Sequence, residues 1–306
     1  MKSKKAEITT HQLVLLIVLI IGFVIILFLL FRLNLGKESD SEICHNSVME
    51  RATLSKTPLD ADTVPLNCQR QYVCITKDGS CEALTKPIKK KVKSEDEIYK
   101  VLAEELRNCW WMFGEGNAKF IDNEAIPKNY CSICSQISFD DSVKKDIITS
   151  GKIDKKLFYE YMAKTKIPEK KITYSEYLYK TNDLNLIFGE AIKQGAGFGE
   201  IDISKTYYAF MVVPTKTNWL TWAAGGALVG VVGTIVIGSS IATGGAAVPF
   251  WVSVVGTTVG GIVGGSVATP IVQSIFGTPV VPPTLIESPP SKEIEAYSCK
   301  DISTMS

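Results

Sequence analysis

The chain contains a stretch of 70 residues, positions 217–286, without a single Asp, Glu, Lys or Arg. Gly245 and Pro249 divide it into two apolar arms, residues 219–242 and 250–276. Each arm is long enough to cross a hydrocarbon core, which takes about 20 helical residues at ~1.5 Å each. The stretch therefore predicts a Gly-rich transmembrane helical hairpin over residues 217–278. The alternative is a hairpin buried in a large soluble protein, but the remaining chain offers too little apolar surface to cover both arms.

Small residues recur at every fourth position along both arms of this stretch. Positions four apart lie on one face of a helix, where the missing side chains let two backbones approach closely in lipid. The stripe fits an internal hairpin as well as a homo-oligomer. We assign helix packing to six glycines: Gly226, Gly230, Gly238, Gly256, Gly260 and Gly264.

A second apolar run lies near the N-terminus and carries no charge between residues 12 and 31. Its length matches one bilayer crossing, so we predict a transmembrane anchor over residues 12–32. Three lysines precede the run, which places residues 1–11 in the cytoplasm. A cleaved secretory signal is the alternative, but its apolar region would be shorter and would end in a small-residue cleavage site.

The residues in front of this run, Lys4-Lys5-Ala6-Glu7-Ile8, resemble the short class III signals of archaeal type IV pilin-like proteins. The resemblance covers the N-terminal signal and the apolar helix that follows it. It implies cleavage after Ala6 and a place in the cell envelope. The predicted hairpin departs from the pilin pattern.

Charge and cysteine content bound the possible functions. The 33 basic and 32 acidic residues nearly cancel, so no overall field favours binding to nucleic acid. An even set of cysteines outside the apolar runs predicts up to four disulfides and an oxidising exterior. Eight cysteines allow 105 pairings, so the connectivity stays open. The cysteines are Cys44, Cys68, Cys74, Cys81, Cys109, Cys131, Cys134 and Cys299.

Residues 38–215 carry most of the polar sequence and are predicted to form a Cys-rich α+β domain outside the membrane. Within it, residues 70–76 predict a short strand that ends in a tight turn at Asp78-Gly79. Five lysines between positions 86 and 93 indicate a solvated linker, with contact to anionic headgroups as the alternative.

Ser94 and Glu97 form a capping box, which predicts a helix that begins there and stops at Gly114. Cys109 lies on the apolar face of this helix, so we expect a buried disulfide to a neighbouring segment. The aromatic residues at positions 110, 111 and 113 are interpreted as packing, with a ligand platform as the alternative.

Further helices and strands are predicted downstream. Asp154 is expected to cap a helix through Lys164 with Leu157, Phe158 and Tyr161 inward, and Thr173 opens a second capping box. Residues 204–213 predict a strand because they are rich in Tyr, Phe and Val. Residues 279–306 are predicted to return to the domain, with a strand at 292–299 that pairs with the strand at 204–213.

The sequence from Cys131 to Phe139 alternates apolar and polar residues, which predicts a strand. Cys131 and Cys134 then project to opposite faces and are poorly placed to bond each other. A thioredoxin-type site needs its Cys-x-x-Cys at a helix N-terminus, and a zinc ribbon needs a second such pair. Both interpretations are therefore disfavoured.

The sequence contains no constellation that predicts catalysis, a metal or a cofactor. The only histidines are His11 and His45, and nucleophilic catalysis would depend on His45, which we place in a loop without an identified partner. Asp140 and Asp141 lie at a strand end and are interpreted as helix-cap or turn residues. The glycines between 189 and 199 lack the order of a phosphate-binding loop.

Together these features predict a non-enzymatic envelope protein, with an α+β disulfide-braced extracytoplasmic domain on an α-helical membrane part. The N-terminus would lie inside, and the main domain and C-terminus outside. Expected partners are membrane lipid and either an envelope protein or further copies of the chain. Two alternatives are a pore or fusion protein that acts through the hairpin, and a thiol oxidoreductase that uses Cys131 and Cys134.

Overall fold

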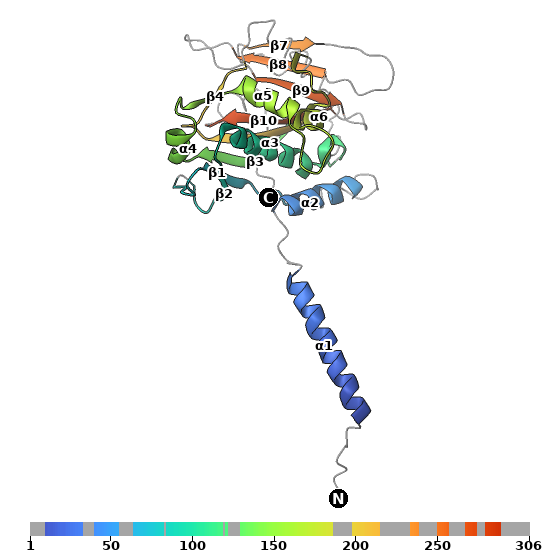
Figure 1. The fold of residues 1–306 in the computed structure, drawn as a ribbon. Coiled ribbons are helices and arrows are strands. Elements are labelled where there is room, and N and C mark those ends of the chain that lie inside the picture. Colours follow the sequence, from blue (N-terminus) through green and yellow to red (C-terminus); the bar gives the residue numbers. More distant parts are fainter. Residues whose placement is uncertain are drawn as a thin grey trace, which may run out of the picture. The chain divides into compact units, whose positions relative to one another are not determined.

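The computed structural model divides the chain into two units, Met1–Ser39 and Asp40–Ser306 (Figure 1). For the strands between 233 and 273 and for residues 279–281, only the backbone is described. The structure describes residues 10–32, 40–54, 64–82, 84–118, 120–121, 129–185, 198–214, 233–238, 250–256, 267–273 and 279–288.

The described part of the first unit is helix α1 (Thr10–Arg32), so the prediction of a helix at this position is confirmed. Its described side chains run from Leu13 to Ile26. A membrane crossing takes about 20 apolar residues, and no helix within the described ranges meets the length and hydropathy required to cross a membrane. The prediction of a transmembrane anchor at residues 12–32 is corrected by this finding.

The prediction of a transmembrane helical hairpin is also wrong, because the described parts of residues 217–278 are strands. These are β7 (Gly233–Gly238), β8 (Phe250–Gly256) and β9 (Val267–Gln273), which pair antiparallel with one another. They are rich in Val, Ile and Thr, whose branched side chains favour an extended backbone. Gly238 and Gly256 end strands instead of lining a helix. The other assigned glycines lie outside the described residues: Gly226, Gly230, Gly260 and Gly264.

The second unit is built on a mixed sheet of eight strands in the order β2-β1-β3-β6-β10-β9-β8-β7 (Figure 1). β1 (Gln71–Thr76) lies between β2 (Ile88–Lys91) and β3 (Asn129–Phe139) and is parallel to both. β6 (Tyr207–Pro214) and β10 (Pro279–Glu287) extend the sheet antiparallel. The carboxyl ends of β1 and β3 therefore meet at one edge of the sheet.

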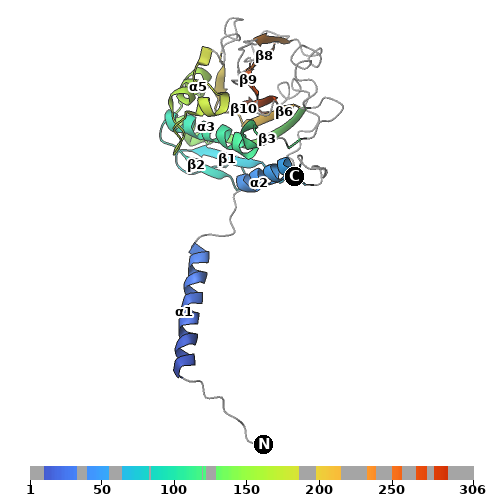
Figure 2. The ribbon, with the colours of Figure 1, turned by 90° about the vertical axis from the view of Figure 1, so that its right-hand side faces the viewer.

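Helices cover one face of the sheet (Figure 2). The longest helix of this unit, α3 (Glu95–Met112), packs across β3, β6 and β10. It also contacts α2 (Asp40–Leu54), α5 (Lys155–Lys164) and α6 (Tyr174–Tyr179). These contacts place the main hydrophobic core between α3 and the sheet.

Shorter elements complete the second unit. A 3₁₀ turn, η2 (Gly114–Gly116), follows α3, and α4 (Asp141–Asp146) follows β3 directly. β4 (Lys152–Asp154) and β5 (Glu200–Asp202) form a separate two-stranded antiparallel sheet. The described part of the chain thus confirms an α+β architecture.

The predicted helix starts are confirmed by their caps. The Glu97 backbone N–H donates to the Ser94 hydroxyl at 3.3 Å, and that of Glu176 donates to the Thr173 hydroxyl at 3.1 Å. Asp154 caps α5 in the same way. Phe158 is buried as predicted, whereas Leu157 is 48% exposed, so its predicted inward position is wrong.

Two of three disulfides in the described part of the chain join segments 24 and 25 residues apart in the sequence. Cys44 of α2 bonds Cys68, with their Cα atoms 4.4 Å apart. Cys109 of α3 bonds Cys134 of β3 across the helix–sheet boundary, with a Cα–Cα distance of 5.5 Å, which confirms the expected buried disulfide.

The third pair, Cys74 and Cys81, closes the loop after β1. Cys131 is also disulfide-bonded, so no cysteine in the described residues is a free thiol. The expectation that Cys131 and Cys134 do not bond each other is confirmed, because Cys134 is joined to Cys109.

The Lys-rich segment at 86–93 is not a linker, since four of its residues form the edge strand β2. All four β2 residues are exposed, and they pair with β1 from Val73 to Thr76. Lysines on an edge strand hinder edge-to-edge association with other chains. The run of lysines therefore did not predict this strand, because the strand forms by pairing with β1 and not through a local sequence pattern.

The strand that pairs with β6 after the Gly-rich stretch is also not the one that was predicted. β6 pairs with β10 at residues 279–287, and the strand predicted at 292–299 lies outside the described residues. Two prolines interrupt β10, and the pairing register shifts between Val281 and Thr284 at that point. A bulge accommodates proline inside a sheet because the missing N–H would otherwise break the ladder.

One carboxyl group, that of Glu105 on α3, is buried in this core. Burial raises the pKa of the Glu105 carboxyl above its ordinary value. The nearby Ser135 hydroxyl and the positive charge of Lys90 lower the pKa of Glu105 and so offset part of the effect of burial. The Ser135 hydroxyl does not, however, reach the geometry of a full hydrogen bond. Glu105 therefore lowers stability as the pH rises through its folded-state pKa, because the folded protein must then bury a charge.

Candidate functional site

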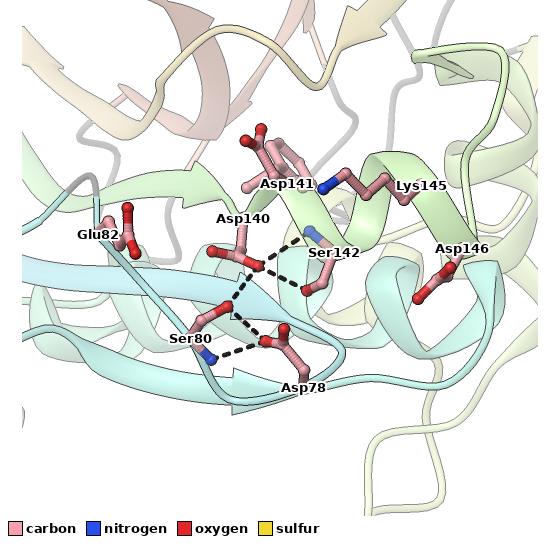
Figure 3. Close-up of a pocket in the computed structure, with 9 residues that line it drawn as sticks. Asp78, Ser80, Glu82, Asp140, Asp141, Ser142, Lys145 and Asp146 are labelled. Atoms are coloured by element: carbon pink, nitrogen blue, oxygen red, sulfur yellow. Dashed lines mark hydrogen bonds between the residues drawn. The ribbon is translucent and has the colours of Figure 1, made fainter.

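A shallow polar pocket lies at the edge of the sheet where β1 and β3 end (Figure 3). In parallel strands these carboxyl ends point the same way, and the loops that follow them converge in space. The Asp140 backbone N–H donates to the Ile75 carbonyl at 2.9 Å and fixes the two loop starts together. The pocket is lined by Asp78, Ser80, Glu82, Phe139, Asp140, Asp141, Ser142, Lys145 and Asp146.

The first wall of the pocket is the loop after β1. Asp78 accepts hydrogen bonds from the Ser80 backbone N–H at 2.7 Å and from the Ser80 and Thr76 hydroxyls. Gly79 has a φ of 97°, which the tight turn requires and which L-residues with side chains rarely adopt. The disulfide between Cys74 and Cys81 joins the two ends of this loop and so holds it in shape.

The second wall is the start of α4. Asp140 is the N-cap residue and accepts from the Ser142 backbone N–H at 3.0 Å and from its hydroxyl at 2.6 Å. The interpretation of Asp140 and Asp141 as cap and turn residues is therefore confirmed.

Three hydrogen bonds and an ion pair join the two walls. Figure 3 shows the Ser80 hydroxyl between the two carboxylates, where its one proton is shared between Asp78 and Asp140, the Asp140 oxygen lying 2.9 Å away. The Lys77 backbone N–H donates to the Ser142 hydroxyl at 3.0 Å, and that hydroxyl lies 3.4 Å from the Thr76 hydroxyl. The Lys77 ammonium lies 3.0 Å from the Asp146 carboxylate. The walls are thus tied both through side chains and through the backbone.

Hydrogen bonds keep both central carboxylates ionised. Those from Ser80 lower the pKa of the Asp78 carboxyl to about 2. Burial raises the pKa of Asp140, but the hydrogen bonds from Ser142 and Ser80 outweigh it, so the pKa lies below its ordinary value. Five carboxylates and a single lysine line the pocket, which therefore carries a negative field at neutral pH.

This arrangement suits electrostatic attraction of a cationic group better than proton transfer. A general acid needs a pKa raised toward neutrality, and a carboxylate pair in acid–base roles needs two well-separated pKa values. Asp78 and Asp140 are both shifted downward instead. Within the described ranges, no three His, Cys, Asp or Glu side chains are grouped as metal ligands.

Replacing Asp140 by alanine is expected to lower the free energy of unfolding by about 1 to 2 kcal/mol, because α4 loses its N-cap acceptor. Urea denaturation followed by far-UV circular dichroism measures this loss. The difference in the free energy of unfolding between wild type and variant should narrow as the pH falls through the lowered folded-state pKa of Asp140. Below that pKa the wild-type carboxyl is protonated and loses the advantage of accepting the cap hydrogen bonds as an anion.

The adjacent Asp141→Ala variant is the matched control, because Asp141 lies in the first turn of α4 without a cap hydrogen bond. Its effect is expected to stay within about 0.5 kcal/mol. Equal losses for the two variants would show that Asp140 does not act through its cap.

The other residues singled out from the sequence do not line this pocket, although the Cys74–Cys81 disulfide closes the loop that forms its first wall. His45 lies on α2, which the sequence did not predict, and not in a loop. Its ring stacks on Trp111 with centroids 4.2 Å apart, and its Nδ1 atom lies 2.7 Å from the Trp111 carbonyl oxygen. Trp110 and Phe113 are buried in the core, which supports their interpretation as packing residues.

The chain matches no family model, no curated protein and no solved structure. The candidate site therefore rests on its own geometry. A sequence signal for it exists in the repeated Asp-x-Ser pattern of residues 78–80 and 140–142, which begins two residues after β1 and directly after β3. Such residues favour turns in which the carboxylate accepts local N–H groups. What the sequence did not indicate is that the two turns meet.

Proposed function

We propose that this chain is a non-enzymatic, disulfide-braced protein of an oxidising compartment outside the cytoplasm. There it serves structural assembly or the recognition of another protein. The observation that carries this proposal is the oxidation of every described cysteine, in pairs that tie helices to the sheet and loops to strands. Disulfides of this kind persist in oxidising compartments and are rare in the cytosol.

The burial of the cysteines supports a structural role for these bonds. Cys44 and Cys109 are 0% exposed, and their partners Cys68 and Cys134 are 4% exposed. A catalytic thiol must instead be accessible and poised as a thiolate. The pairing also gives Cys131 and Cys134 separate disulfides, which does not favour an oxidoreductase that would cycle between these two residues.

The candidate pocket supports recognition over catalysis. Its carboxylates are held ionised by hydrogen bonds from neighbouring hydroxyl and N–H groups, an arrangement that is fixed before any ligand arrives. Preorganised charges steer and orient a partner of opposite charge. A pocket of this kind favours a partner that presents a lysine or arginine side chain.

The test is thiol labelling of intact cells with a membrane-impermeant maleimide, before and after treatment with an external reductant. We expect labelling only after reduction. Peptide mapping of the unreduced protein should recover the three described disulfides. It should also recover Cys131 in a disulfide.

Two outcomes would contradict the proposal. Labelling that requires cell lysis but no reductant would place the cysteines, reduced, in the cytoplasm. Selective reduction under mild conditions of the two disulfides that hold Cys131 and Cys134, with the Cys44–Cys68 and Cys74–Cys81 bonds intact, would favour a thiol oxidoreductase instead.

A further inference from the structure

Arg70 precedes β1 and lies on the face of the sheet opposite α3. Alternate residues of a strand point to opposite faces, and Val73 and Ile75 belong to the core beneath α3. Arg70 and Tyr72 therefore face the other way. Tyr72 is 44% exposed, which leaves an aromatic ring open to solvent on this face.

A row of side chains crosses three strands on this face. Tyr72 of β1 pairs with Gln136 of β3, and Gln136 pairs in turn with Tyr208 of β6. The Arg70 guanidinium carbon lies 5.7 Å from the centroid of the Tyr208 ring, within the range of a cation–π contact. Arg70, Tyr72, Gln136 and Tyr208 are hereafter called the Arg70 face.

The guanidinium of Arg70 is incompletely satisfied. Its Nε atom is buried and has no hydrogen-bond partner, and within the described ranges Arg70 forms no ion pair with a carboxylate. Arg70 as a whole is half-buried, so a partner would meet the outer part of the guanidinium and not the buried Nε atom. The face thus holds a positive charge, without a carboxylate partner in the described ranges, over the Tyr208 ring and on the same side of the sheet as Tyr72.

The same protein contains a completed version of this arrangement. The Lys170 ammonium lies 4.4 Å from the centroid of the Tyr177 ring and 3.8 Å from a carboxylate oxygen of Glu115. Glu115 also accepts a hydrogen bond from the Tyr177 hydroxyl. There the cation, the ring and the carboxylate form one cluster. On the Arg70 face the cation and the ring are present, and the carboxylate is what the cluster lacks.

We propose that the Arg70 face is a docking site for a protein partner that presents a carboxylate side chain to Arg70 and an apolar or aromatic side chain to Tyr72. Arginine binds carboxylates through two parallel N–H···O bonds, which gives the contact direction as well as strength. Tyrosine and arginine are also the residues that most often dominate protein interfaces. The inference rests on the proposed recognition function and assigns it a surface distinct from the acidic pocket.

The test uses the full-length, oxidised, ¹⁵N-labelled protein and a short soluble peptide of alternating glutamate and tyrosine. We expect the peptide to shift the side-chain Nε–H signal of Arg70 in an NMR titration. A peptide with glutamine in place of glutamate should bind at least about tenfold more weakly, because a hydrogen bond to a charged group contributes ~1.5 kcal/mol or more.

Two variants distinguish binding through the paired N–H groups of the Arg70 guanidinium from binding through its positive charge alone. Arg70→Lys keeps the charge but cannot form the paired bonds, so its affinity for the glutamate peptide should fall by about tenfold. Lys170→Gln is the matched control and should bind as the wild type does, because Lys170 already has Glu115 as its partner. If Arg70→Lys folds poorly, Tyr72→Ser tests the same face at an exposed position.

Equal affinity for the glutamate and glutamine peptides would overturn the proposal, as would an unshifted Arg70 signal at saturating peptide. Unchanged affinity in Arg70→Lys would show that charge alone is responsible. Binding of a uronic acid disaccharide without binding of the peptide would assign the face to saccharides instead. None of these results depends on where the protein resides, so the proposed compartment stands or fails separately in the thiol-labelling experiment.

Discussion

Replacing Cys109 and Cys134 together by alanine is expected to lower the free energy of unfolding by about 3 to 4 kcal/mol. The two cysteines are 25 residues apart in sequence, and a crosslink over a loop of that length removes chain entropy from the unfolded state worth ~3.5 kcal/mol at 25 °C. Both side chains are buried, so the double variant also leaves unfilled space between α3 and β3. Urea denaturation of the oxidised wild type and of the variant measures the loss.

The disulfide between Cys74 and Cys81 is the matched control, because it closes a loop of only 7 residues. The same relation gives ~2.4 kcal/mol for a loop of that size, so its removal should cost less than that of the longer crosslink. Its removal should act mainly on the pocket loop that it closes. Equal losses for the two double variants would show that loop length does not govern these bonds.

The elements that the sequence predicted correctly are those with a local signal. Ser94, Asp154 and Thr173 each cap a helix where the pattern placed one, because a cap is a contact between residues two or three positions apart. Helix α2 lacked such a signal. Its buried face is mostly small or polar and includes Ser41, Ser47 and Ala52, which gives little hydrophobic periodicity.

The uncharged stretch at 217–286 shows why an apolar run does not settle its own secondary structure. The four-residue spacing of its glycines suggested a helical face, but the residues between them are largely β-branched. β8 carries Val252, Val254 and Val255, and β7 carries Thr234 to Ile237. Short apolar runs of this kind fit either a buried helix or a buried strand by periodicity alone. The pairing of β9 with β10 shows that this part of the stretch is a strand, and such a pairing cannot be read from the sequence of one segment alone.

The candidate pocket could be predicted in part. Asp78-Gly79 was expected to turn and Asp140 to cap, and both residues do so. That the two turns form one pocket follows from the parallel pairing of β1 with β3, which are separated in the chain by β2 and α3. The Arg70 face was missed for the same reason, because Tyr72 and Tyr208 meet Gln136 only when three distant strands align.

Replacing Trp110 by alanine is expected to cost about 3 to 5 kcal/mol, among the largest effects of any single substitution in this chain. Trp110 is 0% exposed, is one of the largest fully buried side chains and belongs to the hydrophobic core around α3. Its removal opens a cavity that the close-packed core cannot refill. Far-UV circular dichroism in urea measures the loss without relying on tryptophan fluorescence.

Two variants show whether burial is the cause. Trp111→Ala changes the neighbouring residue, which is only half-buried and stacks on His45, and should cost about 1 kcal/mol. Trp110→Phe should cost less than Trp110→Ala. It keeps most of the ring volume and removes an indole N–H that is buried without an acceptor in the described structure. If Trp110→Ala does not fold, the loss in the free energy of unfolding of Trp110→Phe still measures how much the packing of this side chain contributes.

Trp110 follows Cys109 directly on α3, so the two largest predicted effects are not expected to add. Residues in contact with one packed region usually show coupling energies of about 0.5 to 3 kcal/mol. Without the crosslink to Cys134, α3 can shift toward a cavity left by Trp110→Ala, which makes that substitution less costly in the variant that lacks the disulfide. Strict additivity would mean that the disulfide does not hold α3 in place on the sheet, and that it acts on the unfolded chain alone.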